Sequence, residues 1–420
     1  MTAKIYFSKL KVIFIKLKTF GLLYSSSLWD QLLFFLRIPV AEKISFTQNK
    51  KTIIYLGGNL PARIARIIKW HKRFEDYCAV LVCHKDGFRD KYSNPSIDQV
   101  VLFRNHWHLK RILKNLKNVS LIHAFGPKSF YPAVAKKSTL GKKIPFVYDM
   151  QDVLVVYYGL NPPIRWYRNE LSHEKYCLEN ADGLVSHSLE FQEALRRYDI
   201  KKKPANIFFP LCCDDDVAEN KKGNFDPGNI HVVYVGEVAG SFRDSKQFAT
   251  IQFHYIIEEF SKQKIHLHLY AAPGTLSDDI NEYKNIEKQN QYLHIHETVH
   301  QSKLAHELSQ YDFGLIPFFF KDTIHSWEKF KYSTSLKLFN YVEAGIPVIS
   351  TKDIIFQSWI VERYGMGITI NKTDIPNLKS IIGKTDYNLF LKNIEKNRPA
   401  ISLSKHVPRL LKFYETIYRK

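Results

Sequence analysis

The sequence predicts an α/β protein built from two successive parallel sheets, each covered by helices. Short apolar runs alternate with helical stretches along most of the 420 residues. A polar stretch containing Gly and Pro interrupts this alternation between about 201 and 229, and the alternation then restarts. The chain also exceeds the ~250–300 residues at which a single core stops growing, so two domains are expected.

Each half supplies its own set of strands, and ligands of such sheets bind beyond the carboxyl ends of the strands. A cleft between two sheets of this type can hold two substrates. In the first half, strands are expected at 52–56, 79–82, 99–103, 120–124, 144–149 and 183–186, with helices at 62–74 and 168–180. In the second half, strands are expected at 231–236, 266–271, 293–296, 313–317 and 347–350, with helices at 248–263, 303–311 and 336–344.

The N-terminus has a pattern of its own. Tyr6, Leu10, Ile13, Phe14 and Leu17 fall on one helical stripe, and Lys4, Lys11 and Lys18 lie roughly opposite. A second apolar segment follows at 28–38. A basic amphipathic helix suits an anionic membrane surface, although the same pattern also occurs on helices packed against a domain.

Composition limits the partners and the compartment. The chain carries 61 Lys plus Arg against 41 Asp plus Glu, a net charge of +20, so it is expected to meet nucleic acid, an acidic membrane or a phosphorylated substrate. The charge is spread along the chain without a usual basic motif, which argues against nucleic acid. No run reaches the ~18–20 apolar residues of a spanning helix, no signal-peptide pattern is present, and the five cysteines form no CxxC pair. We therefore expect a cytoplasmic protein.

The segment 332–350 is the most informative part of the chain. Ser333, Thr334 and Ser335 open a helix that ends at Gly345 and continues through Pro347 into a buried strand. The opening of a helix offers free backbone N–H groups and a positive dipole end, with the hydroxyls as further donors and Lys337 as a nearby cation. The segment predicts a site for an anion such as a diphosphate, although a capped helix in an α/β unit has the same appearance.

The same segment resembles the donor-side signature of glycosyltransferases with the GT-B fold, of the group-1/group-4 type found in bacterial envelope biosynthesis. The stretches 234–236 and 311–317 agree with that family in order, as do 147–152 and 180–188 on the acceptor side. The resemblance implies two Rossmann-like domains facing a cleft. It divides the chain into a basic extension at 1–48, an acceptor domain at 49–212, a donor domain at 225–396, and a C-terminal helix at 397–420 that crosses back to the first domain.

The resemblance also implies roles for particular residues. Two glutamates that the family usually carries eight positions apart are replaced by Tyr332 and Asn340, which leaves the nucleotide and the stereochemical outcome open. Asn340 can still bond a ribose hydroxyl, and Glu343 lies one turn later. Arg243, Lys246 and Lys337 are expected to hold the leaving diphosphate without a metal ion. The expected donor-binding residues are Gly236, Arg243, Lys246, Ser333, Thr334, Ser335, Leu336, Lys337, Asn340 and Glu343.

On the acceptor side, three strand-end residues are candidates for the catalytic base. They are His123, Asp149 and Asp152, although a strand-end Asp also serves as a turn or capping residue. Gly57 and Gly58 follow the first strand and would let the backbone approach the substrates.

Two patterns could suggest a metal site, and we expect none. The acidic triplet 214–216 lies at the predicted domain crossing, where a solvated linker is the simpler interpretation. The pairs His266/His268 and His294/His296 alternate along strands without ordered Cys or acidic partners. No cofactor other than a nucleotide-sugar substrate is expected.

The leading prediction is a metal-independent transferase of the hexosyltransferase type. It would move a sugar from a nucleotide-sugar to a lipid-linked or polysaccharide acceptor, as in lipopolysaccharide or capsule synthesis, at the inner face of the cell membrane. A non-catalytic binding relative that lost the glutamate pair and a sugar-nucleotide epimerase of the same fold are the alternatives.

Overall fold

A computed structural model describes residues 26–36, 44, 50–71, 74, 76–88, 97–126, 128–162, 164–215, 225–319 and 327–418. The stripe expected within residues 1–20 and the last acid of the 214–216 triplet lie outside the described residues. In the described part, no helix is both long enough and apolar enough to cross a membrane.

The chain divides by residue contacts into two compact units. The first comprises residues 1–149, 172–184 and 417–420, and the second comprises residues 150–171 and 185–416. The domain boundaries predicted from the sequence stay a prediction.

The first sheet has seven strands in the order β3-β2-β1-β4-β5-β6-β7, and β1 pairs in parallel with β2 and β4, as β2 does with β3. Its strands are β1 (Lys51–Gly57), β2 (Tyr77–His84), β3 (Gln99–Phe103), β4 (Leu121–Gly126), β5 (Phe146–Met150), β6 (Gly183–Ser186) and β7 (Ala205–Phe208). The helices along this part are α2 (Ser26–Phe35), α3 (Ala62–His71), α4 (His106–Lys114), α5 (Phe130–Ser138), α6 (Leu154–Tyr158), α7 (Arg165–Asn180) and α8 (Glu190–Arg197). Strand β7 lies within the stretch that we expected to be a linker.

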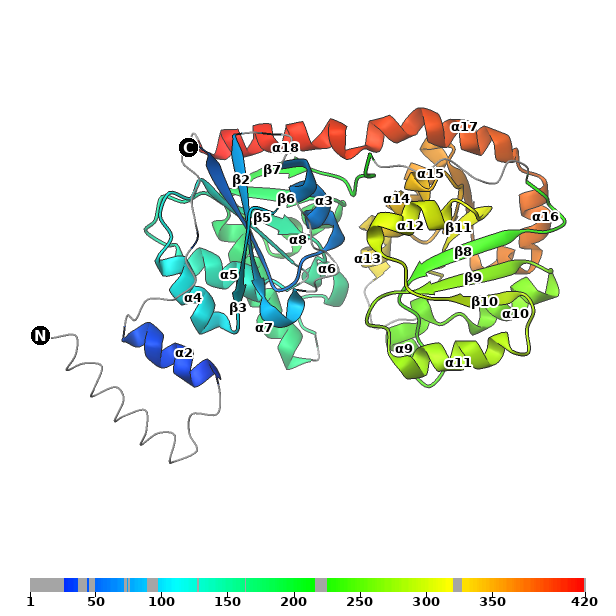
Figure 1. The fold of residues 1–420 in the computed structure, drawn as a ribbon, viewed down its shortest axis with the longest axis horizontal. Helices are drawn as coiled ribbons and strands as arrows, with labels where there is room; N and C mark the ends of the chain where they lie inside the picture. Colours follow the sequence, from blue (N-terminus) through cyan, green and yellow to red (C-terminus); the bar gives the residue numbers. More distant parts are fainter. Residues whose placement is uncertain are drawn as a thin grey trace, which may run out of the picture. The chain divides into compact units, whose positions relative to one another are not determined.

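The second segment of the N-terminal extension packs against the first unit. Helix α2 lies beside α4 (Figure 1), and the fully buried Asp30 accepts hydrogen bonds from Arg104, Asn105 and Arg111 at 2.8–3.3 Å. Lys110 Nζ lies 4.0 Å from the Trp107 ring, which in turn contacts Phe34 and Phe35. For α2, the packed-helix interpretation therefore holds.

The second sheet has six strands in the order β10-β9-β8-β11-β12-β13, and all its neighbouring strands are parallel. Its strands are β8 (His231–Gly236), β9 (His266–Ala271), β10 (Leu293–His296), β11 (Phe313–Ile316), β12 (Val348–Thr351) and β13 (Gly367–Ile370). The helices along this part of the chain are α9 (Ser245–Phe248), α10 (His254–Lys262), α11 (Ser277–Glu287), α12 (Gln301–Leu308), α13 (Trp327–Tyr332), α14 (Leu336–Glu343), α15 (Ile355–Tyr364), α16 (Leu378–Gly383), α17 (Tyr387–Asn397) and α18 (Leu403–Tyr418). The predicted α/β class with two sheets is confirmed.

Helices cover both faces of the second sheet. Figure 1 shows α10 and α11 on one face and α12 and α14 on the other. The first face packs on Val232, Tyr234, Leu267 and Leu269, and the second packs on Val233 and Tyr270. Both faces therefore carry apolar cores, which is why most residues of these strands are apolar, apart from the histidines of β8, β9 and β10.

Candidate functional site

The topological switch point of the second sheet lies between β8 and β11. The chain runs from β8 to β9 and β10 on one side, and then returns to place β11 on the other side of β8. In open α/β sheets, ligands bind at the carboxyl ends of the strands where the order reverses in this way. The candidate site therefore lies beyond Gly236 and Ile316.

Helix α14 begins at this point, and Ser335 caps it. Ser335 has extended backbone angles, and its Oγ accepts a hydrogen bond from the Lys337 backbone N–H at 3.3 Å. The Ser335 N–H donates to Oε1 of the fully buried Gln357 at 2.9 Å, and Gln357 Nε2 donates to Ser350 Oγ at 2.8 Å. The amide of Gln357 thus links the start of α14 to β12 and fixes where the helix begins.

Two of the three hydroxyl groups that we expected to bind an anion, those of Thr334 and Ser335, already form hydrogen bonds within the protein. Thr334 Oγ1 donates to the His187 carbonyl at 3.5 Å, and Ser335 Oγ serves as the cap. The Ser333 backbone N–H donates to the Lys329 carbonyl at 3.1 Å. In the described part of the chain, the backbone N–H of Leu336 keeps no intramolecular partner, so it stays available to an anion.

Lys337 lies directly over the end of β8. Its Nζ is 5.3 Å from the ring centroids of both Tyr234 and Phe318, and a Cβ atom on Gly236 would come within 2.6 Å of its Cε. Gly236 has φ +152, a conformation that favours glycine. Within the described residues, Lys337 Nζ has neither a carboxylate nor a hydrogen-bond acceptor as a partner. Burial lowers the pKa of Lys337 to about 8, against the opposing effect of Glu237.

A half-buried cation without a counter-ion is costly, because it loses part of its hydration and gains no partner. An anionic ligand at the start of α14 would supply the missing charge, together with the helix dipole and the Leu336 N–H. Of the residues predicted from the sequence, Gly236, Leu336 and Lys337 therefore come together in an arrangement that suits a phosphate group.

Arg243 occupies a different environment from the one we expected. Its guanidinium donates two hydrogen bonds to Asp279, at 3.1 and 3.0 Å, and Asp279 also accepts from the Gly240 N–H at 2.9 Å. This pairing raises the pKa of Arg243 and lowers the pKa of Asp279. Arg243 thus holds the loop after β8 against α11, whereas Lys246 is exposed on α9.

The two candidate ribose contacts differ in their surroundings. Asn340 is buried on α14. Glu343 is also buried, and its Oε1 accepts a hydrogen bond from the Asp214 backbone N–H at 2.7 Å. The carboxylate of Glu343 is therefore engaged with the segment after β7, and its donor-binding role stays a prediction.

Tyr341 is a residue whose role the sequence did not indicate. Strands β8 and β11 pair only at Val232–Phe313 and Val233–Gly314. Beyond these pairs, the fully buried Tyr341 hydroxyl donates to the Leu315 carbonyl at 3.0 Å and accepts from the Val235 N–H at 3.3 Å. A side chain on Gly314 would overlap the Tyr341 ring. Tyr341 therefore bridges the two strands just below the switch point.

The three expected base candidates are placed in two environments. Asp149 and His123 are fully buried; His123 Nε2 lies 3.1 Å from Asp149 Oδ2, and Arg63 pairs with the other carboxylate oxygen. Asp152 is about half exposed, and its Oδ1 lies 3.1 Å from Lys329 Nζ. The positive charge of Lys329 is the main cause that lowers the pKa of Asp152. The glycines after β1 pack on side chains of the same unit, Gly57 on Phe125 and Gly58 on Tyr131.

Lys329 is a second residue that sequence analysis missed. It lies on α13, and its Nζ contacts Glu190 Oε1 at 3.0 Å in addition to Asp152. Glu190 is fully buried, and burial is the main cause that raises its pKa, against the effect of Lys329. This cluster fixes the short helix from which the Ser333–Ser335 turn continues.

The histidines of the second sheet form a ladder of hydrogen-bonded rings. His231 Nδ1 lies 2.9 Å from His268 Nε2, and the same spacing joins His266 to His294 and His268 to His296. Burial lowers the pKa of His268 to about 2. Within the described residues, no group of three or more His, Cys, Asp or Glu side chains is arranged to hold a metal ion.

Comparisons with known proteins give a family likeness for the second half of the chain and a fold for most of it. Residues 247–412 match the family model described as "Glucosyltransferase 3-like, C-terminal domain". Sucrose-phosphate synthase from Thermosynechococcus elongatus is similar with a TM-score of 0.62 and 13% identity, over 88% of this chain and 100% of that chain. Anabaena HepE in complex with UDP has a TM-score of 0.62 and 11% identity, over 87% and 100%. No curated protein matches the sequence.

A further similar structure is a Listeria monocytogenes protein assigned as a UDP-N-acetylglucosamine 2-epimerase. Its TM-score is 0.54 and its identity 11%, over 87% of this chain and 96% of that chain. At these identities the likeness establishes the fold. The chain has the GT-B fold, as the resemblance implied, and its residues 247–412 are similar to a glucosyltransferase C-terminal domain.

Proposed function

We propose that this protein is a glycosyltransferase that takes a sugar from a nucleotide-sugar, with the diphosphate bound by Lys337, the Leu336 N–H and the backbone at Gly236. The observation that carries the proposal is the unpaired cation at the switch point, beside the start of α14. The UDP in the complex of HepE supports a uridine nucleotide as the donor.

The chemistry that these residues support is stabilisation of the leaving group. When the bond between the sugar and the diphosphate breaks, negative charge grows on the departing phosphate. A fixed ammonium and a helix N-terminus at that point stabilise this charge without reorganising, so no metal ion is needed in this proposal. Arg243 contributes indirectly, because its pair with Asp279 holds the loop that follows Gly236.

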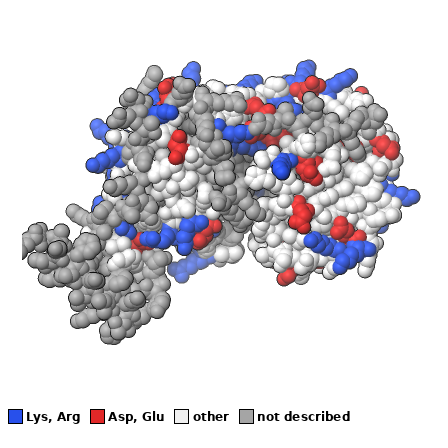
Figure 2. Space-filling model, viewed as in Figure 1, with Lys and Arg blue, Asp and Glu red and all other residues white. Residues whose placement is uncertain are grey.

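For the acceptor, we propose a catalytic base and a general class of acceptor molecule. Of the three candidate bases, Asp152 keeps an exposed carboxylate and suits contact with an acceptor hydroxyl, whereas buried Asp149 and His123 suit a positioning role. We keep a lipid-linked or polysaccharide acceptor at the cytoplasmic membrane face, and the group-1/group-4 type, as parts of the proposal. On the face that Figure 2 shows, basic and acidic side chains of the described residues intermingle, which supports the expectation that nucleic acid is not the partner.

The test is turnover with a panel of UDP-, GDP- and CMP-sugars, followed as release of nucleoside diphosphate. Wild-type protein is expected to release it from at least one donor, and Lys337→Met is expected to lower kcat/KM by about 100-fold or more. Lys284→Met, an exposed lysine on α11, is the matched control and should leave turnover unchanged.

Three results would contradict the proposal. Binding of a nucleotide without any turnover would favour the non-catalytic relative. Conversion of the donor into an isomer without release of nucleoside diphosphate would favour an epimerase. Full activity of Lys337→Met would remove the assigned diphosphate site.

A further inference from the structure

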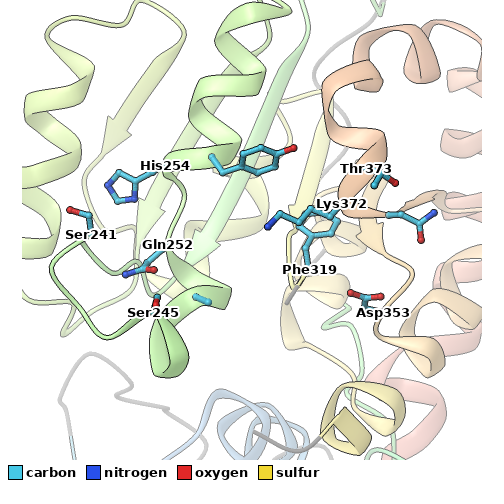
Figure 3. A pocket seen from close by; sticks show the side chains of 11 residues that line it. Ser241, Ser245, Gln252, His254, Phe319, Asp353, Lys372 and Thr373 are labelled. Carbon is cyan, nitrogen blue, oxygen red and sulfur yellow. The ribbon is translucent and has the colours of Figure 1, made fainter. Parts of the chain in front are cut away.

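A second cavity lies at the carboxyl edge of the same sheet. It has a volume of about 830 Å³ and lies beyond the ends of β8, β11, β12 and β13. Figure 3 shows Ser241, Gln252 and His254 along one wall, Asp353, Lys372 and Thr373 along the other, and Phe319 between them. Tyr255, Ser245, Ala249 and Asn371 complete the described lining.

This cavity is separate from the anion site at Lys337. Phe318 contacts the Lys337 ammonium, as Tyr234 does, whereas the next residue, Phe319, lines the cavity. Neither Gly236 nor Lys337 belongs to the lining. The diphosphate contacts proposed above therefore involve none of the residues that line this cavity.

The described lining of the cavity carries equal numbers of acidic and basic side chains. It has one carboxylate, Asp353, and one ammonium, Lys372, whose Nζ lies 5.1 Å from the ring of Tyr255. His254 is held by Glu282 at 2.7 Å. Because the described lining carries one negative and one positive side chain, it offers no net charge to attract a phosphate or a multivalent cation, so a charged ligand is disfavoured.

The remaining lining combines aromatic surface with hydrogen-bonding groups. In the described part of the chain, the hydroxyls of Ser245 and Thr373 have no intramolecular partner. Gln252 Nε2 donates to the carbonyls of Gly240 and Arg243 at 2.9 and 3.1 Å, which fixes its Oε1 as an acceptor. A purely apolar ligand would leave these groups unsatisfied, whereas a ligand with several hydroxyls and an apolar C–H face would pair with them and with Tyr255.

We propose that this cavity binds a neutral saccharide, with Tyr255 against its C–H face and with Gln252, Ser245 and Thr373 as hydrogen-bond partners. The saccharide is either the glycan that accepts the transferred sugar or a free sugar that regulates the protein. Only its use as an acceptor site rests on the function proposed above.

The experiment is saturation-transfer NMR on the full chain with a panel of neutral mono- and disaccharides, with and without UDP. Wild-type protein should bind at least one saccharide in the presence of UDP. Tyr255→Ala and Thr373→Val should each weaken this binding at least about tenfold, with UDP affinity changed less than twofold. Trp359→Ala removes another exposed aromatic ring, on α15, and should change neither.

Two further measurements, one with the Lys337→Met variant and one with a nucleotide-sugar, distinguish the possible explanations. Lys337→Met should lose UDP binding and keep saccharide binding, so failure of the nucleotide site can be told apart from failure of this one. Extension of the bound saccharide in the presence of a nucleotide-sugar assigns the cavity to the acceptor, and binding without extension assigns it to a regulatory sugar. Absence of binding across the panel, or binding that neither Tyr255→Ala nor Thr373→Val weakens, would overturn the proposal.

Discussion

Two cations near the end of β8 show how local partners decide what a charged residue can do. The sequence places Arg243 and Lys337 equally well for binding a diphosphate. In the structure, Arg243 is neutralised by Asp279, whereas Lys337 sits between two aromatic rings without an acidic partner in the described residues. The second arrangement gains more when an anion binds, because the cost of partly dehydrating the Lys337 ammonium has already been met in folding.

The lowered pKa of Lys337 makes nucleotide binding pH-dependent. Because its pKa is about 8 in the free protein, raising the pH from 7 to 9 removes most of the ammonium. The phosphate of UDP stays ionised throughout this window, since its second pKa lies near 6. We expect the affinity for UDP to fall about tenfold between pH 7 and 9, measured by isothermal titration calorimetry at fixed ionic strength.

The control keeps the positive charge at all these pH values. Lys337→Arg should bind UDP with an affinity that changes less than threefold over the same window, because a guanidinium does not titrate there. An equally steep fall in this variant would assign the pH dependence to another group.

At the scale of elements, the site depends on how β8 and β11 part. Their pairing ends at Val233 and Gly314, and Tyr341 from α14 takes the place of the next hydrogen bonds. The helix that carries Lys337 is thereby anchored to both strands whose ends form the switch point. This arrangement requires the absence of a side chain at Gly314, which the ring of Tyr341 covers.

Removing the Tyr341 hydroxyl should therefore affect both stability and binding. Tyr341→Phe leaves a buried N–H and a buried carbonyl without their partner, so we expect the free energy of unfolding to fall by about 2 kcal/mol in chemical denaturation. We also expect UDP affinity to fall at least about threefold, because Gly236 and Lys337 lose their common support.

Tyr387→Phe is the matched control for this effect. The Tyr387 hydroxyl donates to the Asp312 carbonyl at the other end of β11, at 3.2 Å. Its loss should lower stability with UDP affinity unchanged. Equal effects of the two variants on UDP affinity would show that Tyr341 acts through general stability alone.

Over the whole molecule, the buried elements were predictable and the edges were not. Strands such as Gln99–Phe103 and His231–Gly236 agree with the prediction to the residue, because their apolar runs are bounded by polar turns. Strands β7 and β13 were missed, since each has four residues, lies at a sheet edge and is only partly buried. The helix expected at 248–263 is divided by an extended residue, Gln252, whose side chain bonds the loop after β8.

The candidate site was predictable only where it depends on local sequence. A polar turn followed by a helix and a lysine predicts an anion site, and the Ser335 cap confirms the start of that helix. The partners of Arg243, Glu343 and Tyr341 come from segments 36, 129 and 26 to 106 residues away in the chain. Tertiary packing therefore decides which of these side chains can contact a ligand. A local sequence pattern carries no information about these distant partners.

The central claim is that an anionic nucleotide binds where α14 begins, and a crystal structure of the UDP complex tests it most directly. We predict a phosphate oxygen within hydrogen-bond distance of Lys337 Nζ and of the Leu336 N–H, beside the backbone of Gly236. Phosphates bound anywhere else on the protein, with Lys337 still facing Tyr234 and Phe318 alone, would contradict the account.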